Sequence, residues 1–69
     1  MMIHGKVQTF NRITGTGFIS PDAGGQVLPF RQIDVYRRAG DEVREQQRFS
    51  YEISRDSDGE EQAINLRPA

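Results

Sequence analysis

The stretch GKVQTFNRITGTGFISPD, residues 5–22, contains two short segments that are typical of β-strands, together with the turns that bound them. Its apolar residues, and Ile3 just before it, alternate with polar ones at a spacing closer to two than to 3.6, which predicts a strand over residues 3–10. Glycines precede Phe18 and a Pro-Asp turn follows, so a second strand is expected over residues 16–20.

Three further strands are expected along the rest of the chain, separated by turn residues. The clearest one places Phe49, Tyr51 and Ile53 on one face, and we expect Phe49 and Tyr51 to be core residues. Another contains Pro29, which lacks a backbone donor and is therefore confined to an edge, a bulge or a strand end. We expect these strands over residues 26–30, 48–54 and 62–66, with a long loop over residues 34–42 and a hairpin turn over residues 56–59.

Several short strands without a helix of useful length indicate an all-β barrel or sandwich. A chain of 69 residues buries only roughly 60% of the surface that its unfolded form exposes, which excludes a second domain. A closed barrel is favoured because closure removes strand edges that so short a chain cannot cover in another way. We therefore expect one all-β barrel domain over residues 1–69.

Composition limits the setting and the partners. The chain has no cysteine and no apolar run near the ~20 residues of a membrane span, so we expect a cytoplasmic domain without membrane contact. The net charge of −1 gives no overall attraction to phosphate groups. Any binding of nucleic acid must therefore rest on local patches.

The opening stretch and the later strands share their sequence pattern with one family. Residues 5–11 and 15–22 resemble the start of bacterial cold-shock proteins, which read roughly G-x-V-K-W-F-N, then K-G-F-G-F-I, then a Pro-Asp turn. Residues 26–33 are similar to that family's V-F-V-H-F-S-A-I, residues 47–53 to its fourth strand, and residues 63–66 to its A-x-N-V ending. The resemblance covers nearly the whole chain. It implies a five-stranded antiparallel OB-fold barrel that binds single-stranded RNA or DNA on one face.

The chain departs from the family at several positions that the resemblance assigns to binding. The family's tryptophan and three further ring-bearing residues are replaced by Thr9, Thr16, Val27 and Pro29, and two lysines are replaced by Gln8 and Thr14. A stacking ring contributes about 1–3 kcal/mol per base, so at the low end about 3–4 kcal/mol is missing, roughly a few hundredfold to a thousandfold in affinity. We therefore expect weak, sequence-tolerant binding with a shallow dependence on salt.

The resemblance also gives a set of candidate site residues. Phe18 and Phe30 are interpreted as the remaining stacking platform, with Phe10 in support, although core roles for these rings stay open. The residues that we expect at the nucleic-acid interface are Phe18, Phe30, Phe10, Lys6, Gln8, Thr9, Arg12, Thr16, Val27 and Arg31.

Two other features have two interpretations each. Tyr36, Arg37 and Arg38 either contact a nucleotide or belong to a solvated loop whose acidic residues pair with the arginines. Gly15 and Gly17 either admit a phosphate to the backbone or allow a tight connection between strands with unusual φ.

Residues for catalysis or metal binding are scarce. His4 is the only histidine and the chain has no cysteine, so no nucleophile–base pair and no metal-ligand set is evident. The acidic residues 56–61 lack the spacing of a calcium loop. We expect no enzyme activity, no cofactor, no metal and no small-molecule substrate, and we expect a monomer. A second hypothesis keeps the barrel but gives it a protein-interaction or accessory role within a longer protein.

Overall fold

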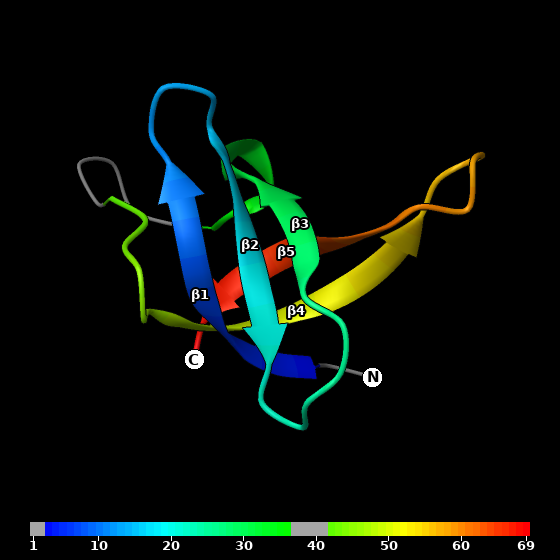
Figure 1. The fold of residues 1–69 in the computed structure, drawn as a ribbon. Helices are drawn as coiled ribbons and strands as arrows, with labels where there is room; N and C mark the ends of the chain where they lie inside the picture. Colours follow the sequence, from blue (N-terminus) through cyan, green and yellow to red (C-terminus); the bar gives the residue numbers. More distant parts are fainter. Residues whose placement is uncertain (1–2, 37–41) are drawn as a thin grey trace.

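The computed structural model describes residues 3–36 and 42–69 and shows a closed five-stranded barrel (Figure 1). Around the barrel the strands follow the order β1-β2-β3-β5-β4. All neighbouring pairs are antiparallel except β3 and β5, which run parallel. The strands are β1 (Ile3–Asn11), β2 (Thr16–Pro21), β3 (Leu28–Arg31), β4 (Arg48–Arg55) and β5 (Glu61–Pro68). The expected all-β barrel is therefore confirmed.

All five strands lie within about two residues of their expected positions. The third was expected over residues 26–30, and β3 begins at Leu28. Pro29 is exposed in β3. On the side that faces β5, β3 forms only one residue pair, Phe30 with Ala63, so this side of β3 is largely unpaired. Pro29 therefore lies in a strand with a largely open edge. A turn of 3-10 helix, η1 (Gln32–Asp34), follows β3 and was not predicted.

The core lies inside the barrel and draws on all five strands. Phe49 and Tyr51 are buried, as expected from the alternation in β4. Ile53 is 43% exposed, because β4 and β5 continue together past the start of β3 at Leu28 and form a hairpin that projects from the barrel (Figure 1). Among the described residues, ten buried apolar residues form one cluster: Val7, Ile19, Leu28, Phe30, Val35, Val43, Phe49, Tyr51, Ala63 and Leu66.

The projecting hairpin ends in the turn that the sequence predicts. The Asp56 carboxylate accepts hydrogen bonds from the backbone amides of Asp58 and Glu60, both at 2.9 Å. Gly59 has a φ of 84°, which an L side chain rarely adopts. Gly59 thus has the positive φ that an Asp-Gly turn allows. Within the described residues, no helix is long and apolar enough to cross a membrane.

Candidate nucleic-acid interface

The outer face of β1, β2 and β3 carries the candidate interface. Strand pairing aligns Thr9 with Phe18 and Phe18 with Pro29, and all three side chains are exposed. The next outer row, two residues further on, consists of Asn11, Thr16 and Arg31. We call these six residues the outer rows. Because residues paired across neighbouring strands share one face of a sheet, Thr9 and Pro29 flank the Phe18 ring.

Phe18 is the exposed ring of the outer rows. Its side chain is 48% exposed, which leaves part of the ring open to a base. The residues beside it, Thr9 and Pro29, offer no aromatic ring. The structure therefore brings one stacking position to this face, where two or three were predicted from the sequence.

Phe30 was wrongly assigned to the stacking platform. It is 1% exposed and belongs to an inner row with Phe10 and Gly17, because alternation along β3 puts Leu28 and Phe30 inside and Pro29 and Arg31 outside. Its ring stacks on that of Phe10, with centroids 5.9 Å apart and an interplanar angle of 13°. Phe10 is half-buried against the core, so its main contact is with Phe30 and not with solvent.

A bulge in β1 explains why the face of Phe10 could not be read from simple alternation. The register shifts between Val7, which pairs with Ile19, and Thr9, which pairs with Phe18. Gln8 is the extra residue, so Gln8 and Thr9 are both exposed in succession. The bulge turns Thr9 outward beside Phe18 and turns Phe10 inward.

The two glycines before Phe18 have structural roles. A Cβ at Gly17 would lie 2.5 Å from the Thr9 carbonyl oxygen and 2.9 Å from the Phe30 ring, so the stack over Gly17 requires a residue without a side chain. Gly15 has a φ of 71°, and its carbonyl accepts a 2.7 Å hydrogen bond from the Gln32 amide. Gly15 therefore fits the interpretation as a tight connection between strands with unusual φ.

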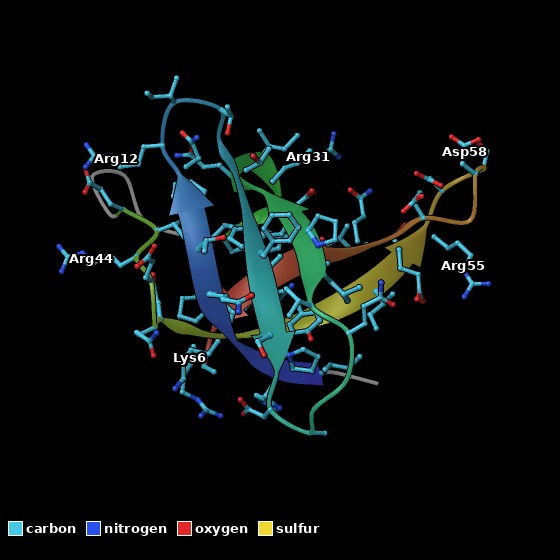
Figure 2. The ribbon with its side chains drawn as sticks, viewed as in Figure 1. Lys6, Arg12, Arg31, Arg44, Arg55 and Asp58 are labelled. Carbon is cyan, nitrogen blue, oxygen red and sulfur yellow. The ribbon has the colours of Figure 1, made fainter. Side chains whose placement is uncertain are left out.

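The predicted cations lie at two ends of the face (Figure 2). Arg12 and Arg31 lie towards the β1–β2 loop, whereas Lys6 lies at the opposite end. Arg12 pairs with Glu42 and Arg31 with Asp34, both with N–O distances of 3.4 Å. A phosphate group that approaches either arginine therefore competes with a carboxylate. The Arg12–Glu42 pair is exposed, and such pairs contribute only about 0–1 kcal/mol, so competition there is weak. The Asp34 side chain is only 21% exposed.

The remaining predicted residues are less closely tied to the face. Val27 is half-buried and precedes β3, outside the strand pairing. Tyr36 is 53% exposed, donates a 3.4 Å hydrogen bond to Asn65, and has the Arg67 guanidinium 4.9 Å from its ring centroid. Arg37 and Arg38 lie outside the described residues.

Two exposed isoleucines beside the outer rows were missed by the sequence analysis. Ile13 in the β1–β2 loop is 95% exposed and Ile33 in η1 is 80% exposed. They border a shallow cleft of about 350 Å³ that also includes Arg12, Arg31 and Thr16. The sequence does contain a sign of this exposed residue, because Ile13 is apolar but lies in a polar turn where no core position is expected.

The barrel with a part-aromatic outer face defines the class of protein as an OB-type barrel. No protein-family model matches the chain. It is 41% identical to the probable cold shock protein y4cH of Sinorhizobium fredii (strain NBRC 101917 / NGR234), over 97% of this chain and 99% of that protein. The chain therefore belongs to the cold-shock protein family.

Proposed function

We propose that this chain binds single-stranded RNA or DNA weakly and with little sequence preference, through the outer rows of β1–β3. The observation that carries the proposal is the half-exposed Phe18 ring at the centre of these rows. Every base has a π-face, so stacking on one ring tolerates any sequence. Membership of the cold-shock family supports the same reading, since nucleic-acid binding is typical of the family.

The other residues of the face determine how strongly a nucleic acid binds and which path its backbone follows. Lys6 lies beyond one end of the rows and Arg31 within them, so a backbone that follows the face meets a cation near each end. The Thr9 hydroxyl can hydrogen-bond to bases or sugars. Asn11 Oδ1 already accepts from the backbone amides of Ile13 and Thr14, and the Thr16 hydroxyl is hydrogen-bonded to that of Thr14, so these two residues mainly hold the β1–β2 loop. Phe30 has no part in stacking, so we assign one base to the platform. We further propose that the chain acts as one cytoplasmic, monomeric domain without catalytic activity.

The test compares two exposed aromatic residues of similar accessibility. Fluorescence anisotropy with a labelled oligothymidylate at low salt measures the affinity of Phe18→Ala and Tyr36→Ala. We expect Phe18→Ala to weaken binding about 5-fold or more, because one stacked base contributes about 1–3 kcal/mol. Tyr36→Ala, outside the outer rows, is expected to leave affinity within about 2-fold. Equal losses for both variants, or no loss at Phe18, would contradict the proposal.

A second candidate function is a protein-interaction role, and one observation favours it. Ile13 and Ile33 expose apolar side chains at the same end of the face. Exposed apolar side chains that gather on one part of a surface, unlike scattered single ones, are typical of docking surfaces. If the wild-type chain shows no oligonucleotide binding at millimolar concentration, this second role becomes the better account.

A further inference from the structure

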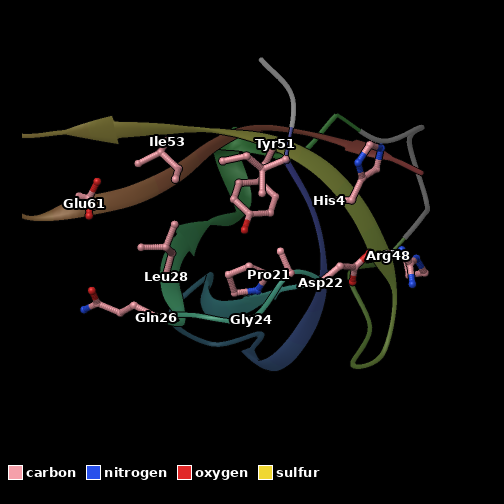
Figure 3. A pocket seen from close by; sticks show the side chains of 12 residues that line it. His4, Pro21, Asp22, Gly24, Gln26, Leu28, Arg48, Tyr51, Ile53 and Glu61 are labelled. Carbon is pink, nitrogen blue, oxygen red and sulfur yellow. Dashed lines mark hydrogen bonds and ion pairs between the residues drawn. The ribbon is translucent and has the colours of Figure 1, made fainter.

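A pocket lies at the end of the barrel where the β2–β3 loop and the projecting β4–β5 hairpin face each other (Figure 3). It has a volume of about 760 Å³, within the range of about 300–1,000 Å³ typical of small-molecule sites. None of its lining residues belongs to the outer rows or to the residues predicted for the nucleic-acid interface. It is therefore a separate candidate site.

The walls of the pocket are mainly apolar. Ile3 from β1, Leu28 from β3 and Ile53 from β4 line it, together with Pro21. The pocket exists because β3 is short: β3 starts at Leu28 and touches β5 only at Phe30, so Ile53 lacks a strand opposite it on this side. These side chains offer apolar contact to a ligand and no charge.

One polar group is buried among these walls without a partner. The Tyr51 side chain is completely buried, and its hydroxyl has no hydrogen-bond partner among the described residues. Figure 3 shows this hydroxyl pointing into the space between Leu28 and Pro21. A buried hydroxyl is normally hydrogen-bonded, so an unpaired one at a pocket is a natural contact for a ligand atom.

The charges around the pocket decide which ligand fits. Asp22 pairs with Arg48 at the mouth, and Glu61 pairs with Arg55 at an N–O distance of 3.5 Å. Burial raises the pKa of the Tyr51 hydroxyl, and the Asp22 carboxylate adds to the effect, so this hydroxyl stays protonated and can donate. Asp22 and Arg48 offset each other's charge, so this pair gives an anionic ligand no net attraction, and the Glu61 carboxylate also lines the pocket. His4 also lines the mouth.

We propose that this pocket binds a small, uncharged, mainly apolar molecule with one hydrogen-bond acceptor, which accepts from the Tyr51 hydroxyl while its apolar body contacts Ile3, Leu28 and Ile53. The ligand is bound and not converted, since no nucleophile–base pair lines the pocket among the described residues. The proposal is independent of nucleic-acid binding because the two sites share no residue.

The experiment is an amide-shift titration of the labelled chain with acetophenone, and with benzoate as the anion of similar size. Acetophenone is expected to give saturable shifts at Ile3, Leu28 and Ile53 and no shifts in the outer rows. Benzoate is expected to bind at least about 10-fold more weakly. Shifts that do not saturate up to the solubility limit of acetophenone, or equal affinity for benzoate, would overturn the proposal.

Matched variants test the role of the hydroxyl. Tyr51→Phe removes only the oxygen and is expected to weaken acetophenone binding about 3- to 10-fold, whereas Tyr36→Phe, the same change at an exposed tyrosine, leaves it unchanged. Unchanged affinity in a folded Tyr51→Phe variant would refute the assigned contact. If Tyr51→Phe does not fold, Ile53→Lys replaces a part-exposed wall residue and is expected to abolish binding; retained binding there would equally overturn the proposal. An oligothymidylate titration of the same samples reports separately on the nucleic-acid interface.

Discussion

The inner and outer faces of β1–β3 carry contrasting residues, although the same three strands supply both. The inner rows, Val7–Ile19–Leu28 and Phe10–Gly17–Phe30, are apolar and closely packed. The outer row through Phe18 has lost the rings that the cold-shock pattern places beside it, at Thr9 and Pro29. Folding depends on the inner rows and stacking on the outer ones, so the two can change independently within one sheet.

The largest expected effect comes from the inner face. Phe30→Ala removes a buried ring and its stack on Phe10, which should lower the free energy of unfolding by about 3–5 kcal/mol. Urea denaturation followed by circular dichroism measures the change. Phe18→Ala, the same substitution on the outer face, is expected to cost less than about 1 kcal/mol. Equal costs for the two variants would remove the distinction between the faces.

The next effect sharpens the comparison by adding a ring to the outer face. Thr9 is exposed and pairs with Phe18, so Thr9→Trp places an indole beside the existing ring. One added stacked base should raise oligothymidylate affinity about 5- to 150-fold, the equivalent of about 1–3 kcal/mol. Ser57→Trp, at the distant hairpin turn, is the control and should change affinity little. A Thr9→Trp variant that binds no better than wild type would show that this row does not contact bases.

A smaller effect concerns the ion pairs at the edge of the face. Glu42→Gln releases Arg12 from its carboxylate partner, which should raise oligonucleotide affinity about 2- to 3-fold at low salt. The gain should vanish at high salt because screening weakens exposed charges. Glu60→Gln changes the net charge equally but lies on the projecting hairpin. Equal gains from both variants would point to net charge instead of the released arginine.

The last prediction concerns alkaline pH and the core. The pKa of Tyr51 is raised above its ordinary value of 10.0 in the folded chain, chiefly by burial and secondarily by Asp22. The unfolded chain therefore loses this proton first as pH rises. The stability that the neutral hydroxyl provides is fully present below pH 10 and is lost as pH rises through the folded pKa. Urea denaturation between pH 9 and 11 should show a steeper loss for wild type than for Tyr51→Phe, with Tyr36→Phe behaving as wild type.

Much of the fold could be predicted from the sequence because local patterns determine it. Turn residues and period-two alternation located the five strands, and Phe49 and Tyr51 were correctly assigned to the core. Ile53 continues the same alternation but is part-exposed, because exposure there depends on where β3 begins. That is a property of the neighbouring strand and cannot be read from β4.

The candidate site was less predictable, for physical reasons that differ between residues. The bulge at Gln8 changes which side Phe10 faces, and no residue pattern in β1 signals it. Phe30 was assigned to the outer face on the family resemblance, although its alternation with Leu28 puts both side chains inside. The pairing of Arg12 with Glu42 joins residues 30 positions apart, and the pocket around Tyr51 needs four separate segments of the chain. Such long-range contacts follow from the closed barrel and not from local sequence.

The most direct test of the central claim is an amide-shift titration of the labelled chain with a short pyrimidine-rich single strand at low salt. The account predicts fast-exchange shifts concentrated at Thr9, Thr16, Phe18 and Arg31, with Lys6 at the edge and the pocket residues unmoved. No shifts at millimolar oligonucleotide, or shifts centred away from the outer rows of β1–β3, would contradict it.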